Sequence, residues 1–490
     1  MILKEMLEYL EYTCVQGEDT RSVQELVYDS RKTTQDSVFV CISGAVSDGH
    51  AYAKEVAEKG AAAIIVEKEV DVPSDITVIR VKDTRIALAY MSAAYFGHPA
   101  KRLKTIGITG TKGKTTTTYM IKSILENTGK KVGLIGTIET IIGDTVIPAN
   151  NTTPESYTIQ ETFAKMLEAG CECVVMEVSS QGLKLNRVAG FTFDYGIFTN
   201  LGEDHIGGVE HTDFEDYLTS KSKLFKQCKK GLINIDDEHA LQILEGHTCE
   251  VETFGFGDQA DIRATDIRLL QKPGFLGIAY QVQGLMDMEV EMNIPGKFNV
   301  YNSLCAISLC RQFGVTNEEI IKALSSVHVR GRVELVPVSK HFSVMLDYAH
   351  NAMSLESLLS TLKEYNPKRL VCVFGCGGNR ARSRRFEMGE VSSKMADLTI
   401  VTSDNPRFEE PQDIVNDILE GVKRGPGKYV EIIDRKEAIR YSIDHAEEGD
   451  IIVVAGKGHE DYQEIKGVKY HMDDRELIRE VAAESKSPLL

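Results

Sequence analysis

The feature that most constrains this chain is a glycine-rich turn between an apolar run and a threonine-rich segment. Residues 103–118 read LKTIGITGTKGKTTTT. The apolar run predicts a strand, and the residues from Lys114 onward predict the start of a helix. Gly110 and Gly113 would let the backbone curl so that its N–H groups face phosphate. Lys114 adds a mobile positive charge and Thr115 can reach a magnesium ion, so the segment predicts a nucleotide-binding loop.

This loop departs from the commonest phosphate-binding pattern at one position. GxxxxGK[ST] places Gly where this chain has Ile108, so the match is to a TGTxGKT variant. A purely structural turn is the alternative interpretation, but Gly-Lys-Thr-Thr after an apolar strand favours nucleotide binding. The predicted phosphate-binding residues are Gly110, Thr111, Lys112, Gly113, Lys114, Thr115 and Thr116.

Polar residues that follow two later apolar runs predict a magnesium site. Glu177 ends the run CVVME, and Asn200 and His205 follow the run YGIFTN. Neighbouring parallel strands end at one edge of a sheet, where carboxylates can hold the magnesium that phosphates need. A lone His is more often structural, so the prediction depends mainly on Glu177.

Strand-like and helix-like segments alternate along most of the chain and predict an α/β fold. Residues 1–100 form a mixed segment that closes with the helical stretch RIALAYMSAAYFG before His98-Pro99. The runs from LKTIGIT to LINI define a second segment, residues 101–330, and those from FSVMLDY to IIVVAG define a third, residues 331–490. Three domains also suit a chain of 490 residues, at ~100–200 residues per domain.

Composition excludes several classes of protein. A formal charge of -17 disfavours a nucleic-acid partner, because phosphate backbones are bound by clustered Lys and Arg. Ten cysteines are too dilute for a disulfide scaffold and lack zinc-site spacing. No apolar run reaches the ~18–20 residues of a membrane span, and charged residues near the N-terminus argue against a signal segment. We therefore expect a cytoplasmic protein without membrane insertion.

Further motifs, in this order, resemble those of the Mur ligases, and among them the enzymes that add the third residue of the peptidoglycan stem peptide. The similarity covers nearly the whole chain. The motifs are DSR (29–31), GTKGKTT (110–116), NTTP (151–154), MEVSS (176–180), YLTSK (217–221), PGKFNVYN (295–302), GRVE (331–334), DYAH (347–350), GCGG (375–378), DNPR (404–407) and GKGHE (456–460).

The resemblance implies an N-terminal UDP-binding domain (1–100), a central P-loop ATPase-type sheet (101–330) and a C-terminal Rossmann-like domain for the amino acid (331–490). It assigns the nucleotide-linked muramoyl-dipeptide to Ser30, Asn151, Thr152, Thr153, Ser179 and Arg187. It assigns further ATP contacts to Asn299, Asn302, Arg332, Asp347 and His350. It assigns the amino acid to Arg380, Asp404, Asn405, Pro406, Arg407, Gly456 and Glu460.

Lys221 matches the lysine that the family carbamoylates. An ordinary ammonium, with a pKa of ~10.4, cannot bind a cation, whereas a carbamate is a carboxylate-like magnesium ligand. Lys223 lies two residues away, so the assignment depends on register. The resemblance thus implies catalytic roles for Lys114, Glu177, His205 and Lys221, and magnesium ligands in Thr115, Glu177, His205 and the Lys221 carbamate.

The activity that the resemblance implies is ATP-dependent amide formation through an acyl phosphate, with ATP and magnesium as cofactors. The partners are small molecules: UDP-MurNAc-L-Ala-D-Glu, ATP and an amino acid, bound by a monomer. The motif DNPR is typical of enzymes that add meso-diaminopimelate, because Arg407 can pair with the distal carboxylate that lysine lacks. Glu460 would suit the distal ammonium.

Other functions stay open at this point. The same chemistry with lysine or another amino acid, or a folylpolyglutamate synthase with the same P-loop variant, would use much of this machinery. From a different class, a P-loop phosphotransferase or a nucleotide-regulated binding module would need no amino acid at all.

Overall fold

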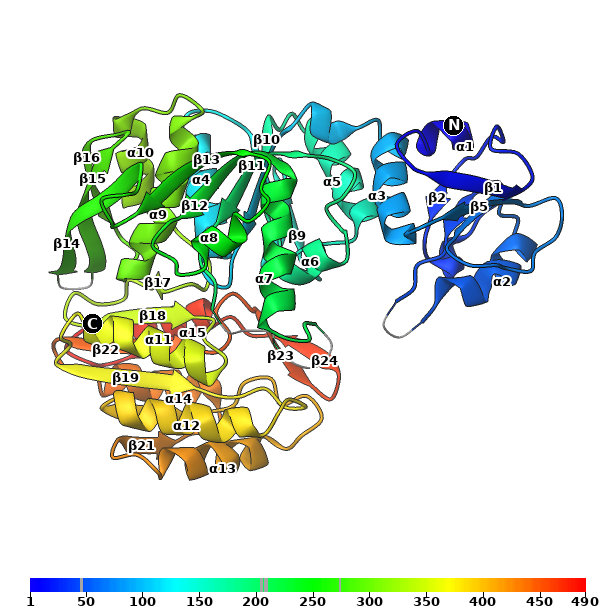
Figure 1. Ribbon diagram of the computed structural model, residues 1–490. Helices are drawn as coiled ribbons and strands as arrows, with labels where there is room; N and C mark the ends of the chain where they lie inside the picture. Colours follow the sequence, from blue (N-terminus) through cyan, green and yellow to red (C-terminus); the bar gives the residue numbers. More distant parts are fainter. Residues whose placement is uncertain (45–46, 203–205, 207–209, 273–274) are drawn as a thin grey trace. The chain divides into compact units, whose positions relative to one another are not determined.

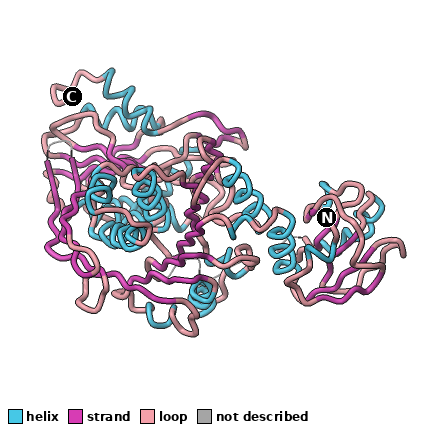
Figure 2. Tube along the Cα trace, turned by 90° about the horizontal axis from the view of Figure 1, so that it is seen from above, coloured by secondary structure: helices cyan, strands magenta, loops and turns pink. Residues whose placement is uncertain are grey.

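The computed structural model describes residues 1–44, 47–202, 206, 210–272 and 275–490. The chain divides into two compact units, which we describe separately. The first comprises Met1–Asp261 and Cys305–Phe313, and the second comprises Ile262–Leu304 and Gly314–Leu490. Helices and strands occur together in both units (Figure 1, Figure 2), so the predicted α/β class is confirmed.

The first unit begins with a five-stranded sheet in the order β1-β5-β4-β3-β2. Its core strands are apolar and buried along their whole length, as parallel strands covered on both faces must be. The strands are β1 (Tyr12–Gln16), β2 (Leu26–Val27), β3 (Val38–Val40), β4 (Ala63–Val66) and β5 (Thr77–Val81), and the helices are α1 (Leu3–Met6), α2 (Ala53–Glu58) and α3 (Thr84–Tyr95).

A second set of strands in the first unit has the order β13-β12-β11-β6-β10-β7-β8-β9. β6 lies between the parallel strands β10 and β11, with Glu177 opposite Ile108 and Phe198 opposite Thr109. The carboxyl ends of these three strands therefore meet at one edge. The strands are β6 (Lys104–Thr109), β7 (Val132–Ile135), β8 (Glu139–Ile142), β9 (Thr145–Pro148), β10 (Cys173–Glu177), β11 (Phe193–Phe198), β12 (Cys228–Asn234) and β13 (Glu250–Gly255). The helices are α4 (Lys114–Asn127), α5 (Ser156–Glu168), α6 (Ser180–Lys184), α7 (Phe214–Ser222) and α8 (Ala240–Ile243).

Tyr157 on α5 joins the two sheets of the first unit. Its ring packs against Tyr28, Tyr95 and Phe96 with centroid distances of 5.8, 6.4 and 5.1 Å. All four rings are half-buried, and aromatic contacts of this kind stabilise the junction.

The second unit contains an antiparallel set of β14 (Ile262–Lys272), β15 (Phe275–Gly284) and β16 (Met288–Met292), with α10 (Asn317–Ser325). α9 (Lys297–Arg311) has residues in both units. A six-stranded sheet follows in the order β17-β18-β22-β19-β20-β21, parallel except for β17. Its strands are β17 (Glu334–Leu335), β18 (Ser343–Asp347), β19 (Arg369–Phe374), β20 (Leu398–Val401), β21 (Lys428–Glu431) and β22 (Asp450–Ala455), and β23 (Tyr462–Ile465) and β24 (Val468–His471) form a separate hairpin.

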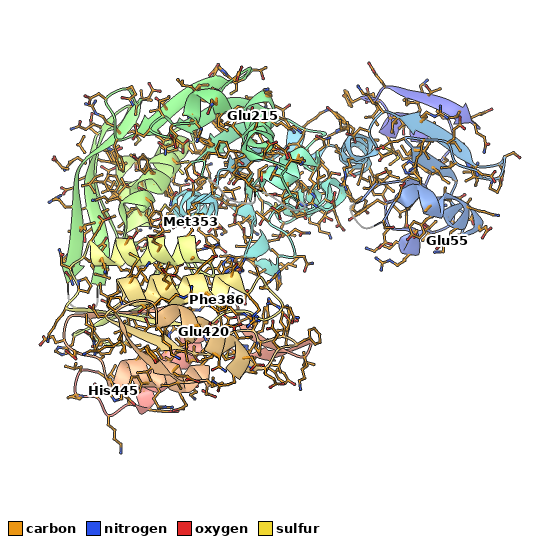
Figure 3. All side chains as sticks on the ribbon, turned by 60° about the horizontal axis from the view of Figure 1, so that its bottom comes forward. Glu55, Glu215, Met353, Phe386, Glu420 and His445 are labelled. Carbon is orange, nitrogen blue, oxygen red and sulfur yellow. The ribbon has the colours of Figure 1, made fainter. Side chains whose placement is uncertain are left out.

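Five helices accompany the six-stranded sheet: α11 (Ala352–Lys363), α12 (Ser383–Met395), α13 (Pro411–Val422), α14 (Arg435–Asp444) and α15 (Asp474–Glu484). α12 and α13, which carry the labelled Phe386 and Glu420 in Figure 3, approach closely at a glycine. A Cβ on Gly421 would lie 2.0 Å from the Phe386 carbonyl oxygen. Only glycine therefore permits this close approach of α12 and α13.

The structure adds two observations to the sequence analysis. Every helix among the described residues is too short or too polar to cross a bilayer. All ten cysteines are free thiols, nine of them buried. The bounds of the three domains predicted from the sequence, residues 1–100, 101–330 and 331–490, stay a prediction.

Candidate active site

The glycine-rich loop forms the strand, turn and helix that the sequence predicted. β6 ends at Thr109 and α4 begins at Lys114. Gly110 and Gly113 have φ angles of 145° and 87°, a region that other residues rarely adopt. A Cβ on Gly110 would also lie 1.9 Å from Thr199 Oγ1 at the start of the next loop. Both glycines are thus required by the backbone.

Two lysines converge on one carbonyl of this loop. Lys114 Nζ donates to the Gly110 carbonyl oxygen at 2.8 Å and to that of Thr111 at 3.2 Å. Lys221 Nζ, from α7, donates to the same Gly110 oxygen at 2.9 Å. Lys221 is 1% exposed and packs over the ring of Tyr217. The turn is therefore a strongly positive position, suited to a polyphosphate.

The Glu177 carboxylate is buried at the end of β10, beside this turn, and is 1% exposed. Thr115 Oγ1 donates to it at 3.0 Å, and the N–H and Oγ1 of Thr137 donate at 2.9 Å. These bonds satisfy a buried charge that would otherwise be costly. The oxygen atoms of Thr115 and Glu177 are the ligand type that magnesium prefers, so these residues fit a magnesium ion.

The other two predicted magnesium ligands are His205 and the Lys221 carbamate. His205 lies outside the described residues. No cluster of three His, Cys, Asp or Glu suited to a metal occurs in the described part of the chain. A magnesium site here would therefore need ligands beyond that set, such as the Thr115 hydroxyl, phosphate oxygens or a modified Lys221.

The residues expected to hold the muramoyl-dipeptide connect to Glu177. Thr153 Oγ1 donates to the Glu177 carbonyl oxygen at 3.0 Å and accepts from Ser179 N at 2.9 Å. Thr152 Oγ1 lies 3.1 Å from Thr137 Oγ1, and Arg187 Nη1 donates to the Thr153 carbonyl oxygen at 3.0 Å. Hydrogen bonds therefore join most of this predicted set to the predicted magnesium ligand.

The last two members of this set lie apart from that network. Asn151 is exposed beside it. Ser30 lies in the N-terminal sheet region, in a short 3₁₀ turn capped by Asp29. Its carbonyl oxygen accepts a hydrogen bond from Lys59 Nζ at 3.0 Å.

Sequence reasoning missed a buried histidine that joins α6 to α7. His211 is 1% exposed, with Nε2 2.9 Å from Ser180 Oγ and Nδ1 3.2 Å from Asp216 Oδ2. Burial lowers its pKa, so the ring is neutral near pH 7. It holds the turn after Glu177 against the helix that carries Lys221. The only sequence signal was a His five residues before an Asp.

In the second unit, the predicted amino-acid residues gather at the carboxyl ends of β20 and β22. Asn405 is the hub: its Nδ2 donates to Glu460 Oε2 at 2.8 Å. Its Oδ1 accepts from Lys457 Nζ at 3.2 Å and from Glu464 N at 3.0 Å. Asn405 is 2% exposed, so the site is built on a buried amide with both ends used.

Arg407 is held in a strained backbone conformation after Pro406. Its φ is 53°, its Nη1 donates to the Gly378 carbonyl oxygen at 2.7 Å, and its Nε donates to Glu464 Oε2 at 3.2 Å. A non-glycine residue with positive φ costs energy and often marks a functional site. Arg380, also predicted to bind the amino acid, is exposed.

The carboxylates of Glu460 and Asp404 lie near each other in this site. Burial and the charge of Asp404 raise the pKa of Glu460. A Cβ on Gly456, which has φ 108°, would lie 2.9 Å from Asp404 Oδ2. Only glycine leaves room there, and the paired acids suit a ligand ammonium group.

The predicted ATP contacts of the second unit fall into two places. Arg332 stacks over Tyr348 at 4.9 Å, and His350 Nδ1 lies 2.9 Å from the Tyr348 carbonyl oxygen. Asp347 accepts from the N–H groups of Val333 and Ala349, both at 2.8 Å. These three predicted residues therefore border one tyrosine at the end of β18.

The other two lie on α9. Asn302 Nδ2 donates to Asn299 Oδ1 at 2.9 Å, and both side chains are buried.

A buried arginine that the sequence analysis did not single out supports the DNPR turn. Arg385 is 2% exposed and donates to Asp417 at 2.9 Å and to Glu409 at 2.7 and 2.8 Å. Glu409 also accepts from Asn379 N, and Phe408 N donates to Asn379 Oδ1 at 3.1 Å. This network ties the loop after β19, which contains Asn379, to the loop after β20, which contains Arg407.

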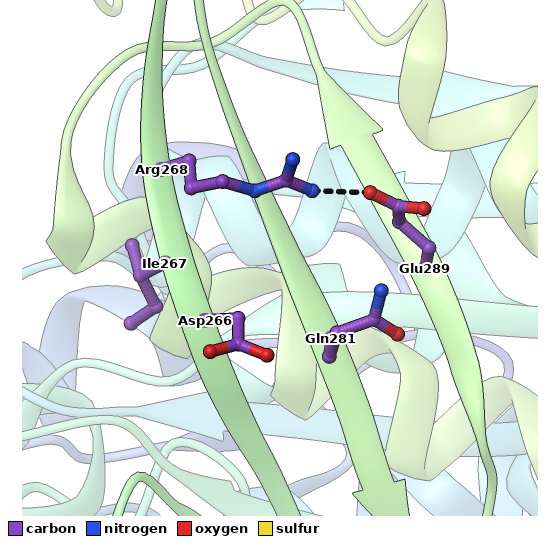
Figure 4. A pocket seen from close by; sticks show the side chains of 5 residues that line it. All are labelled: Asp266, Ile267, Arg268, Gln281 and Glu289. Carbon is purple, nitrogen blue, oxygen red and sulfur yellow. Dashed lines mark hydrogen bonds and ion pairs between the residues drawn. The ribbon is translucent and has the colours of Figure 1, made fainter.

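A separate hollow of about 600 Å³ lies on the antiparallel strands of the second unit (Figure 4). Asp266, Ile267, Arg268, Gln281 and Glu289 line it, and Arg268 pairs with Glu289. Asp266 has a φ of 50° where the register of β14 shifts. No predicted site residue is among the residues that line this hollow, and a β-bulge in β14 lies beside it.

Comparison with known families gives three matches in chain order. Residues 22–96 match the Mur ligase family catalytic domain, residues 108–310 the Mur ligase middle domain, and residues 331–458 the Mur ligase glutamate ligase domain.

Two curated relatives are similar over nearly the whole chain. The UDP-N-acetylmuramoyl-L-alanyl-D-glutamate--2,6-diaminopimelate ligase of Clostridium perfringens is 44% identical over 98% of this chain and 99% of its own length. The enzyme of the same name from Caldanaerobacter subterraneus is 43% identical over 96% and 97%. A solved structure with that name superimposes with a TM-score of 0.74, 27% identity and 99% coverage of both chains.

His459 generates a prediction about acid stability. Burial, then the charges of Arg332 and Arg330, lowers its pKa to about 3, so it is neutral in the folded protein. Unfolded histidine has a pKa of ~6.5, so the unfolded chain binds the extra proton first as pH falls. The contribution of neutral His459 to the free energy of unfolding is therefore complete above pH ~6.5 and is lost progressively toward pH 3. We expect His459→Asn to flatten the decline of unfolding free energy between pH 7 and 4, measured by urea titration. Parallel curves for both proteins would show that His459 does not titrate on unfolding.

Proposed function

The chain belongs to the Mur ligase family, and we propose that it is an ATP-dependent ligase that adds meso-diaminopimelate to the D-Glu carboxyl of UDP-MurNAc-L-Ala-D-Glu. The product would be a nucleotide-linked tripeptide for peptidoglycan, made in the cytoplasm by a monomer. The observation that carries this proposal is the hydrogen-bonded group of Glu177, Thr115 and Thr153, which links the phosphate-binding loop to the predicted dipeptide residues.

The chemistry begins with activation of a carboxylate. One carboxylate oxygen attacks the γ-phosphorus of ATP, a new O–P bond forms, and ADP leaves with the electrons of the broken P–O bond. Lys114 offsets the negative charge that gathers in this transition state. The product of this step is an acyl phosphate, in which phosphate is a good leaving group.

Magnesium, when bound, would neutralise phosphate charge and orient the γ-phosphate for attack. Thr115 and Glu177 would hold it, with His205 and Lys221 as its carbamate as further ligands. The loop residues Gly110, Thr111, Lys112, Gly113 and Thr116, together with Asn299, Asn302, Arg332, Asp347 and His350, would bind ATP. Ser30, Asn151, Thr152, Thr153, Ser179 and Arg187 would bind the nucleotide-linked dipeptide.

The second step joins the amino acid. Its neutral amine attacks the acyl carbon, the tetrahedral intermediate expels phosphate, and the amine loses a proton. Arg407 would pair with the distal carboxylate of meso-diaminopimelate, and Glu460 and Asp404 would face its distal ammonium. Arg380, Asn405, Pro406 and Gly456 would complete the site. A lysine-adding enzyme would leave the Arg407 charge without this partner.

The central test is phosphate release from ATP with magnesium and UDP-MurNAc-L-Ala-D-Glu, with and without meso-diaminopimelate. We expect release to require both substrates. Lys114→Ala should lower kcat roughly 10²–10³-fold, because it removes charge stabilisation of the transition state. Lys122→Ala, on the same helix and paired with Glu126, is the matched control and should retain activity. Release that is indifferent to the substrates would support a phosphotransferase instead.

Arg407 generates a prediction about amino-acid choice. Arg407→Ala should lower kcat/KM for meso-diaminopimelate about 10²-fold, the loss expected for a charge-assisted pair worth ~2–3 kcal/mol. The value for lysine, which has no distal carboxylate, should change far less. Steady-state rates with both amino acids measure this. Equal losses for the two would rule out the role given to Arg407.

A further inference from the structure

The arginine expected to bind the substrate carboxylate already contacts a carboxylate of the chain itself. Glu464 Oε2, on β23, accepts from Arg407 Nε at 3.2 Å. Both side chains are largely buried, at 21% and 23% exposure. The pair is therefore partly shielded from water.

The backbone fixes Glu464 beside Arg407. Arg407 N donates to the Glu464 carbonyl oxygen at 2.9 Å, and Lys466 N donates to the Arg407 carbonyl oxygen at 2.6 Å. These two bonds form a parallel bridge between Arg407 and Ile465. The Glu464 carboxylate is consequently held within reach of the guanidinium by main-chain pairing rather than by the ion pair alone.

The contacts of Arg407 leave no undisturbed edge for a second carboxylate. A carboxylate binds a guanidinium best through two parallel N–H donors, at the Nε and Nη2 edge or at the Nη1 and Nη2 edge. The Glu464 carboxylate accepts from Nε, and the Gly378 carbonyl oxygen accepts from one of the two N–H groups of Nη1. A side-chain carboxylate can rotate away, whereas the Gly378 carbonyl is part of the loop, so only the Nε edge can be cleared cheaply.

The other charged side chains of the site bear on which cation could bind the distal carboxylate of the amino acid. Lys457 is a second buried cation, but it lies 3.7 Å from Glu460 and also donates to Asn405. Asp404 adds a further buried carboxylate. Arg407 is thus the cation that a distal carboxylate would need, and Glu464 already offsets part of its charge.

Resting on the function proposed above, we infer that Glu464 is a specificity-determining residue that competes with the distal carboxylate of the amino acid for Arg407. The substrate gains its two-donor contact at the Nε edge only when the Glu464 side chain moves aside. Glu464 therefore raises the KM for meso-diaminopimelate and reduces the preference for an amino acid with a distal carboxylate.

The test is steady-state kinetics of the full-length Glu464→Gln variant with ATP, magnesium and UDP-MurNAc-L-Ala-D-Glu. Glutamine keeps the size and the backbone bridge but removes the charge. We expect the KM for meso-diaminopimelate to fall about fivefold with kcat unchanged, the size expected for one partly exposed ion pair. The kcat/KM for lysine should not rise. Glu476→Gln, which removes a charge beside His471 of the same hairpin, is the control and should leave all values unchanged.

Each other outcome has a distinct meaning. A KM for meso-diaminopimelate that is unchanged or higher in Glu464→Gln would overturn the inference, because Glu464 would then be neutral or would orient Arg407. An equal gain for lysine would also overturn it. If the parent protein makes no product with meso-diaminopimelate, the proposed function itself fails, and that result is visible before any variant is compared.

Discussion

A single buried carboxylate organises the nucleotide end of the first unit. Glu177 ends β10 at the edge where β6 also ends, and it accepts hydrogen bonds from Thr115 and Thr137. Its main-chain oxygen accepts from Thr153, which in turn orients Ser179. A charge at this depth persists only when it is fully bonded, so the phosphate-binding loop and the predicted dipeptide residues are positioned by the same group.

The second unit uses a buried amide in a comparable way. Asn405 joins Glu460, Lys457 and the main chain of Glu464 through both ends of its side chain. This places one arginine and two acids around a site that suits a zwitterion with a charged distal end. Acyl transfer to such an amino acid needs no chemistry from these residues beyond orientation, because the activated carboxyl already carries its leaving group.

The α/β class and the local form of the glycine-rich turn followed from the sequence because both depend on short-range patterns. Apolar runs of parallel strands and the order glycine, lysine, threonine are visible in a single segment. Contacts between distant residues were not predictable. Lys221 meets Gly110 across 111 positions, and Arg385 meets Glu409 and Asp417 only after two helices pack. Glu464 carried no signal of its own, and His211 carried only an Asp five residues later, because an isolated His or Glu is usually a surface or core residue.

The proposed mechanism depends most on transfer of the γ-phosphate to the substrate carboxylate. It can be measured with UDP-MurNAc-L-Ala-D-Glu labelled with ¹⁸O in the reacting carboxyl group. This mechanism predicts that one ¹⁸O atom appears in the released inorganic phosphate for each amide bond formed, because the carboxyl oxygen leaves with the phosphate. Phosphate without label, accompanied by amide product, would contradict an acyl phosphate intermediate.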